Sequence, residues 1–397
     1  MKGWLSLYLI EEFAGNEKQW SDFVDFPSTD HTLNPHFTFY HKWNWGEHLR
    51  STASETGNQF MRIGVLHVPE NGVKKLVGVA NCVCAPLRVG GQKYWYIPRG
   101  ICMEYTDPSV VKDVYEQVKR FFKDTGCALV RFDPNLVVST NATDEPEVTA
   151  HESDLAAVGA IRQLGTQSAA VWPQVERVWI AEIQSAGEDQ EKRQLEWLKE
   201  HGMRKRLVSQ LRKAGREGVQ FSVSSEEEDL EQFLRMLNAL DERKGGIGKH
   251  LDEYYRKQFK LMKTDGTEVL IKAEYQGQVL AMAFMTVFGA EASYLHGASS
   301  EEFRNLVGPQ FMHFSFMNWL SENMPSVKYY NFWGVISEQM HQKGHPGSGY
   351  SGFKRNFGGY EVNYVRAQEF VFKPMSRIVN FFVDKLWAYK NREALGF

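Results

Sequence analysis

A glycine-rich segment between residues 344 and 359 combines an adaptable backbone with side chains suited to binding a substrate. Six of its sixteen residues are glycine, and glycine lets a ligand approach the main chain closely. Phe353 and Lys354 are adjacent within the part, Tyr350–Phe357, that we expect to become ordered. An aromatic ring beside a fixed cation suits a base, a sugar or an anionic oxygen. An exposed loop with a solvated lysine has the same composition, so both interpretations stand at this point.

The segment upstream of the glycines indicates how the lysine is positioned. Residues Tyr329–Val335 form an aromatic and apolar run typical of a buried strand, so the glycine loop follows a strand end. The sequence contains no Gly-x-Ser-x-Gly motif and no cysteine with a histidine neighbour suited to activate it. Such motifs supply the nucleophile in covalent catalysis. We therefore expect a direct reaction without a covalent enzyme intermediate.

Length and composition describe an ordinary globular protein. A chain of 397 residues is long for one hydrophobic core and predicts two domains. Its net charge of −3 excludes a general attraction to nucleic acid, so any such site must be a local basic patch. The aromatic share of 13% is high, which suits sites for sugars or bases but equally suits a core.

The four cysteines predict a reducing environment rather than a metal site. The spacing of Cys82 and Cys84 is too tight for a usual zinc site, and no histidine pair accompanies them. We expect four buried free thiols, no metal and no cofactor. The sequence shows no signal peptide and no apolar run of about 18 residues. These features predict a soluble, cytoplasmic protein.

Strands and helices alternate along the chain, with hairpins in both halves. This order predicts a mixed α/β or α+β fold rather than a sandwich. Residues 138–170 are polar and are expected to form a surface loop or the approach to a second domain. The closing helix, Ser376–Glu393, has an apolar face that either packs on the first domain or lies at a membrane surface.

One long basic helix is predicted over Gln194–Glu217. Lys205, Arg212 and Arg216 fall at i, i+7 and i+11, which places the three cations on one helical face. The opposite, apolar face is formed by Leu207, Leu211 and Ala214. The cations either contact phosphates, through a salt-dependent attraction, or form a solvated surface.

Two other cations lie in contexts that favour phosphate binding less strongly. Asn34–Pro35 is a helix-start signal, and it predicts an aromatic helix through Phe37–Gly46 that contains Lys42. Arg243 lies near the end of another predicted helix. The helix dipole alone favours a cation there, so a solvated side chain explains this arginine equally well.

Tyr294 and His296 are two residues apart on a predicted strand. Alternation along a strand places both side chains on one face of the sheet. That face lines a cleft or belongs to the core.

Several motifs, taken in order, resemble the Fem family of peptidoglycan interpeptide-bridge aminoacyltransferases. The resemblance covers nearly the whole chain and is most specific from residue 171 onward. In the first half it is carried by Trp45-Gly46, Ile97-Pro98-Arg99-Gly100 and Arg131-Phe132-Asp133-Pro134. In the second half it is carried by Val171-Trp172-Pro173, the end of the basic helix at 211–219, Tyr294–Ser300, Arg304-Asn305-Leu306, Tyr329–Gly334 and Ser351–Gly359.

The resemblance implies two tandem GNAT-like (acyl-CoA N-acyltransferase-like) domains without a coiled-coil arm. Residues 1–170, completed by 366–397, would form the first domain and residues 171–365 the second. The implied reaction moves an amino acid from aminoacyl-tRNA to the stem-peptide amine of a peptidoglycan precursor, either lipid II or UDP-MurNAc-pentapeptide. A lipid-linked acceptor would bring the protein into peripheral contact with a membrane.

The resemblance also implies roles for particular residues. Lys354 would face the reacting ester and stabilise the negative oxygen of the tetrahedral intermediate, with Phe353 beside it. The substrate-binding residues would be Phe353, Arg243, Lys42, Arg99 and Tyr294, and the tRNA-binding residues Lys205, Arg212 and Arg216. The sequence departs from the family pattern at Asn331, often Asp in the family, and at Ile101, usually Pro.

Two other functions remain compatible with the sequence. An acyl-CoA-dependent N-acyltransferase of the GNAT superfamily needs a phosphate-binding loop before a helix. Arg304–Pro309 occupies that place but contains a proline and lacks the second glycine. A non-catalytic protein that binds precursor or tRNA is the other alternative, and the Phe353–Lys354 pair argues against it.

Overall fold

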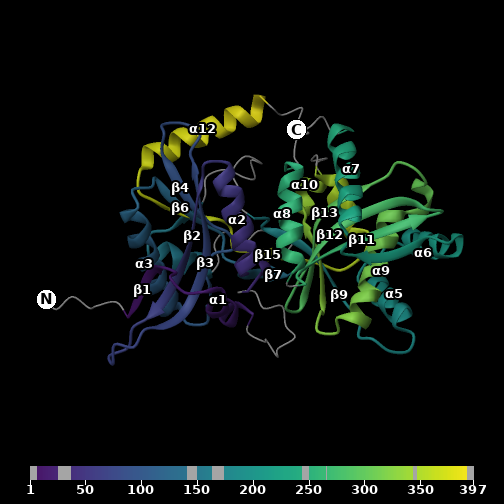
Figure 1. Cartoon of the computed structure of the whole chain (residues 1–397), viewed down its shortest axis with the longest axis horizontal. Helices are drawn as coiled ribbons and strands as arrows, with labels where there is room; N and C mark the ends of the chain where they lie inside the picture. The colour runs from purple at the N-terminus through teal and green to yellow at the C-terminus, as the bar shows by residue number, and fades with distance from the viewer. Residues whose placement is uncertain are drawn as a thin grey trace.

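The computed structural model describes residues 7–25, 37–140, 150–162, 174–243, 250–264, 266–342 and 347–390. These residues form two lobes, each built on a mixed β-sheet covered by helices (Figure 1). Figure 1 shows the two sheets side by side, with α12 (Pro374–Lys390) along the upper edge of the first lobe.

The first sheet contains eight described strands in the order β1-β2-β3-β4-β6-β16-β8, with β5 paired to β3. Neighbouring strands are antiparallel except β4 and β6, which run parallel, with Tyr94 opposite Leu129. The strands are β1 (Tyr8–Glu12), β2 (Gln59–His67), β3 (Lys75–Pro86), β4 (Lys93–Ile97), β5 (Cys102–Met103), β6 (Leu129–Phe132), β8 (Ile161–Arg162) and β16 (Gln368–Val371).

The second sheet also contains eight described strands, in the order β10-β11-β12-β13-β14-β9-β15-β7. Here β13 and β14 form the one parallel pair among the described strands, with Ala292 opposite Tyr330. The strands are β7 (Val137–Thr140), β9 (Arg177–Glu182), β10 (Gln220–Ser224), β11 (Glu268–Tyr275), β12 (Gln278–Phe288), β13 (Glu291–Ser299), β14 (Tyr329–Gly334) and β15 (Tyr360–Tyr364).

Both lobes therefore follow one plan. In each lobe, the last strand of an antiparallel run is connected through a helix to a strand that pairs with it in parallel. In the first lobe α3 (Pro108–Asp124) lies between β4 and β6, and in the second α9 (Gly308–Asn323) lies between β13 and β14. In α3, Val111, Val114 and Val118 recur at helical spacing and are buried in the first core. The sequence pattern did not predict that each sheet contains a parallel pair of strands.

Helices cover both faces of each sheet, and strand alternation explains how. In β12, Ala283 and Met285 face the core beneath α5, α6 and α9, whereas Met282 and Phe284 face the core beneath α7 and α8. The first lobe has α1 (Glu17–Val24), α2 (Trp43–Glu55), α3, α4 (Ala150–Ala157) and α12. The second has α5 (Gln190–Glu200), α6 (Lys205–Glu217), α7 (Glu227–Arg243), α8 (Asp252–Lys263), α9, α10 (Glu338–Gln342) and α11 (Ser348–Arg355). Since α7 and α8 pack on this sheet, they do not form a projecting arm.

The prediction of one basic helix over Gln194–Glu217 is wrong. The chain forms two helices, α5 and α6, separated at Gly202, whose φ is +94°. The amide of Met203 bonds back to the carbonyl of Leu198 at 2.8 Å, which closes α5 in the manner of a helix C-terminus. Both residues are buried in the second core, so the turn fixes where α6 begins.

The aromatic segment predicted as a helix through Phe37–Gly46 is also not continuous. A 3-10 turn (Phe39–His41) is followed by an extended Lys42, and α2 begins at Trp43. The predicted start at 34–35 lies outside the described residues. Phe39, Tyr40 and Trp45 all pack against Met262 and Trp333 of the second lobe. No single helical face could direct these three rings to one side, so tertiary packing overrides the helical pattern.

Residues 138–170 were expected to form a surface loop or the approach to a second domain, and their described part contains most of β7 together with α4 and β8. Strand β7 pairs with β15 in the second sheet, whereas β16, from near the C-terminus, lies between β6 and β8 in the first. The chain thus exchanges one strand in each direction between its lobes. The domain bounds at residues 170 and 366 stay predictions.

The returning strand β16 is joined to the first lobe by buried ions. Glu369 is 1% exposed, and its carboxylate accepts from Arg131 Nη2 at 2.6 Å and from Arg377 Nε at 2.6 Å. A buried carboxylate keeps its charge when cations on both sides satisfy it. This cluster of three ions therefore links β6, β16 and α12.

We expect Glu369→Ala to lower the free energy of unfolding by about 3–5 kcal/mol, because Arg131 stays buried without its ion partner. Urea denaturation of the full chain measures this loss. Glu70→Ala, at an exposed glutamate, is the matched control and should change stability by less than about 0.5 kcal/mol. A loss below about 1 kcal/mol for Glu369→Ala would contradict the role given to this cluster.

Candidate functional site

The glycine-rich segment forms a short helix, α11, and this helix carries Phe353 and Lys354. Lys354 is 8% exposed, and its Nζ donates to the carbonyl of Gly334 at 2.6 Å. The alternative of a solvated surface lysine is therefore wrong. Phe353 is half-buried against the second core. Residues 343–346, including His345, lie outside the described residues.

Aromatic rings surround the Lys354 amine. Its Nζ lies 5.9 Å from the ring centre of Tyr294 and 5.4 Å from that of Tyr350. Burial lowers the pKa of Lys354 to about 7. Near neutral pH the amine is thus divided between its charged and neutral forms, so it can present a cation to a developing negative charge at little cost.

The Gly334 carbonyl is aimed by a local distortion at the end of β14. Trp333 has a φ of +68°, which is costly for a bulky residue. The amide of Trp333 donates to Asn331 Oδ1 at 2.7 Å, and Asn331 Nδ2 donates to Glu291 Oε1 at 3.0 Å. Asn331 therefore stabilises the turn at Trp333 and so positions the Gly334 carbonyl that accepts from Lys354.

The last two glycines of the segment are required by close contact. Gly358 and Gly359 have φ of +80° and +116°, and a Cβ added to them would lie 2.3 Å from the Leu198 carbonyl oxygen and 2.2 Å from that of Ile180. The amide of Arg204 also bonds the carbonyl of Asn356 at 3.1 Å. The start of the basic helix α6 is thereby joined to the end of the helix that carries Lys354.

The prediction that Tyr294 and His296 share one face is wrong. The register between β12 and β13 shifts so that His296 lies opposite Phe284 and Tyr294 opposite Met285, and a β-bulge at Leu295 separates them. Tyr294 faces the Lys354 side, whereas His296 packs edge-on against Tyr255 on the other face.

His313 of α9 is a residue near the site that the sequence did not single out. Its Nδ1 lies 2.5 Å from the hydroxyl of Tyr330, and its ring contacts those of Tyr294 and Phe353. Burial, with a smaller effect of Lys354, lowers the pKa of His313 to about 3, so this imidazole is neutral. A histidine in an apolar helix resembles an ordinary core residue, and the sequence alone offers no signal that separates the two.

Two predicted binding residues lie where the lobes meet. Lys42 is the N-cap of α2; its Nζ lies 3.6 Å from Asp25 and 5.8 Å from the ring centre of Phe288 in the other lobe. Arg99 is 3% exposed, and its guanidinium donates to the Val175 carbonyl at 3.1 Å and lies 5.6 Å from the ring centre of Trp333. Arg99 therefore packs against Trp333, the residue before the Gly334 carbonyl that accepts from Lys354.

The remaining predicted cations are on the surface of the second lobe. Arg243, at the end of α7, pairs with Glu301, and its Nη2 donates to the Ser299 carbonyl at 3.3 Å. The side chains of Lys205, Arg212 and Arg216 are exposed along α6. Burial of Leu207, Leu211 and Ala214 confirms the predicted orientation of this helix. The structure thus brings Lys354, Phe353 and Tyr294 together and leaves the other candidates apart from them.

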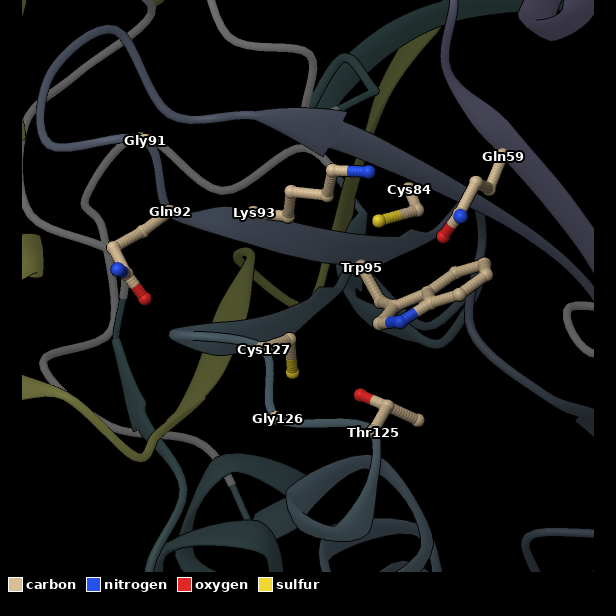
Figure 2. A pocket seen from close by; sticks show the side chains of 9 residues that line it. All are labelled: Gln59, Cys84, Gly91, Gln92, Lys93, Trp95, Thr125, Gly126 and Cys127. Carbon is tan, nitrogen blue, oxygen red and sulfur yellow. The ribbon is translucent and has the colours of Figure 1, made fainter.

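All four cysteines are free and buried, as predicted. The side chains of Cys84 and Cys127 line a pocket of about 260 Å³ in the first lobe, with Trp95 and Lys93 beside them (Figure 2). Burial raises the pKa of Cys84 to about 11, which makes this thiol a poor nucleophile. Among the described residues no group of three or more His, Cys, Asp and Glu side chains is placed to hold a metal ion.

A buried amine beside aromatic rings, at a strand end in a GNAT-like lobe, is suited to acyl transfer. Comparison with known families supports this class, because the pattern of a GNAT acetyltransferase domain matches residues 201–355. The pattern of the FemAB family matches residues 39–269. The chain belongs to the FemAB family and is an acyltransferase with two tandem GNAT-like lobes.

Solved structures share the fold. The crystal structure of FemX superposes with a TM-score of 0.72 at 17% identity and covers 93% of this chain and 100% of its own. A conserved protein of unknown function from Bacteroides thetaiotaomicron superposes with a TM-score of 0.50 at 9% identity, covering 91% and 99%. No curated protein sequence matches the chain. Among the described helices, none is long and apolar enough to cross a membrane.

The lowered pKa of Lys354 predicts a stability that depends on pH. A lysine in an unfolded chain has a pKa of about 10.4, so between about pH 7 and pH 10 the unfolded chain binds more protons than the folded one. The free energy of unfolding of the wild type, relative to Lys354→Met, should rise by about 2 kcal/mol or more across this range.

Urea denaturation at several pH values measures this difference. Lys75→Met, at an exposed lysine, should show no such trend. A wild-type curve parallel to that of Lys354→Met would mean that the amine is fully charged when folded.

Proposed function

We propose that this protein transfers an amino acid from aminoacyl-tRNA to the stem-peptide amine of a peptidoglycan precursor. The observation that carries the proposal is the position of Lys354, buried among aromatic rings on a helix whose end is bonded to the start of α6. The resemblance of the Phe353–Lys354 segment to the Fem family supplies the substrate class.

The chemistry needs little beyond a fixed positive charge. The acceptor amine attacks the carbonyl of the aminoacyl ester, and a negative oxygen develops on the tetrahedral carbon. The Lys354 ammonium stabilises that oxygen. The bond to the terminal ribose oxygen then breaks; the amine loses one proton and the leaving hydroxyl gains one.

We assign the cations of α6 to the tRNA. Lys205, Arg212 and Arg216 share one exposed face, and the eleven residues that separate the first from the last span about 16 Å of helix. Lys205 stands at the end bonded to α11. A phosphate backbone that follows α6 toward its N-terminus would bring an acceptor end toward Lys354.

We assign the precursor to the region between the lobes. Lys42, where the lobes meet, and Arg243, on the surface of the second lobe, would contact its phosphates, and Tyr294 would contact the precursor beside Lys354. The Arg243–Glu301 pair is on the surface, where ion pairs contribute little and a phosphate can replace the carboxylate. The role of Arg99 in substrate binding stays a prediction; its described contacts support Trp333.

The acyl-CoA alternative has less support. A site for the pyrophosphate of CoA requires accessible backbone amides at the start of a helix. The corresponding helix in the second lobe is α9, which follows β13. Here Leu306, Val307 and Gly308 are buried, and a Cβ at Gly308 would lie 2.5 Å from that of Leu280. This segment is packed against β12 rather than open to phosphates.

We expect Lys354→Ala to reduce amino-acid transfer by about 10²–10³-fold, the usual effect of removing one oxyanion-stabilising donor. The measurement gives the full chain a set of radiolabelled aminoacyl-tRNAs with lipid II or UDP-MurNAc-pentapeptide and follows label into the precursor. Lys75→Ala is the matched control. Absence of transfer from every aminoacyl-tRNA, with acetyl-CoA accepted instead, would overturn the proposal in favour of the acyl-CoA alternative.

The α6 cations predict a salt-dependent affinity for tRNA. Arg212→Ala and Arg216→Ala together should weaken binding and reduce the slope of log K against log salt by about 1–2, because each phosphate contact releases counterions. Filter binding at several salt concentrations measures the slope. The matched control is Arg120→Ala with Lys123→Ala, at exposed cations of α3. Equal slopes for both double variants would place the tRNA elsewhere.

A further inference from the structure

The C-terminal helix α12 is attached to the first lobe through polar side chains. Asn380, 4% exposed, accepts from the amide of Val89 at 3.1 Å and donates to its carbonyl at 3.4 Å. Arg377 reaches Glu369 and the carbonyl of Arg162. Lys373, just before the helix, donates to the Gly126 carbonyl at 3.0 Å. These residues recur every three to four positions and so form one stripe on the side that faces the protein.

The opposite side of α12 is apolar and exposed. Its outer stripe, defined by Met375, Ile378, Val379, Phe382 and Leu386, has side chains 39–70% exposed. Positions i, i+3, i+4, i+7 and i+11 fall within one narrow arc of a helix. An ordinary surface helix buries its apolar stripe and exposes its polar one, and α12 does the reverse. A contiguous exposed patch of this kind marks an interaction surface.

Charge and aromatic content identify the partner. Lys373 and Arg377 face the protein, so the charge beside the outer stripe comes from Lys385, which is exposed. The sequence adds Lys390 at the end of α12, and Asp384 is the acid within the bounds of the helix. Cations beside an apolar stripe complement an anionic lipid surface. The same stretch of sequence contains Trp387 and Tyr389, residue types favoured at a membrane interface.

We propose that α12 docks this protein on anionic phospholipid bilayers, lying in the plane of the interface with its outer stripe among the acyl chains. The helix is not among those able to cross a membrane, which agrees with an in-plane orientation. Figure 1 shows α12 along the upper edge of the molecule, and α10, which precedes the Lys354 helix, in the upper half of the second lobe. Docking would hold the transfer site near the surface where a lipid-linked acceptor resides.

Vesicle sedimentation tests the proposal with the full chain, in the absence of tRNA and precursor, so that its result is independent of the proposed reaction. Wild-type protein should partition onto vesicles of equimolar phosphatidylglycerol and phosphatidylcholine, and less onto phosphatidylcholine alone. Phe382→Ser with Leu386→Ser should lower the partition coefficient about tenfold or more. The matched control, Val73→Ser, changes an exposed apolar residue in the turn before β3 and should bind like the wild type.

Three results would overturn the proposal. Wild-type protein that sediments with neither vesicle rules out lipid docking, and a double variant that partitions like the wild type rules out the outer stripe. A wild-type dimer in sedimentation velocity without lipid, converted to monomer by the double variant, would assign the stripe to a second copy of the chain. Equal thermal midpoints for the wild type and the double variant show that folding is preserved, so that lost binding then supports the proposal.

Discussion

The hydrogen bond from Lys354 to the Gly334 carbonyl depends on a distortion that the rest of the molecule stabilises. Trp333 holds a left-handed conformation, which an isolated strand end would not adopt. The side chain of Asn331, in the same strand, accepts from the backbone amide of Trp333. Tyr40, from the other lobe, stacks on the indole ring of Trp333, with 6.2 Å between the ring centres. The cost of placing an amine in an apolar setting is offset by contacts from both halves of the chain.

The junction between lobes is therefore part of the site. The Tyr40 hydroxyl donates to the side-chain oxygen of Gln174. The carboxylate of Asp133 accepts from the backbone amide of Gln174 and, at 2.7 Å, from that of Arg99. These buried and half-buried hydrogen bonds connect the first sheet to the segment that enters the second. The second lobe expressed alone would lose the contacts that Tyr40 and Arg99 make with Trp333, the residue before the carbonyl that Lys354 bonds.

Local patterns predicted most of the elements, and their failures share one cause. Helical spacing identified the buried and exposed faces of α6, since a single core decides those positions. The helix predicted for Phe37–Gly46 is interrupted because its rings pack against both lobes at once. The shared face predicted for Tyr294 and His296 is wrong because the bulge at Leu295 separates them. Lys354 was found through its neighbours in sequence, whereas His313 comes from a distant helix and has no local signal.

The position of β16 constrains how the molecule assembles during synthesis. This strand lies inside the first sheet, between β6 and β8, yet it is among the last described parts of the chain. The ribosome adds residues from the N-terminus, and domains fold as units once their segments have emerged. The first sheet must then wait, with an edge of β6 unpaired, while the whole second lobe is made. The lobe that begins the chain is therefore the last to be completed.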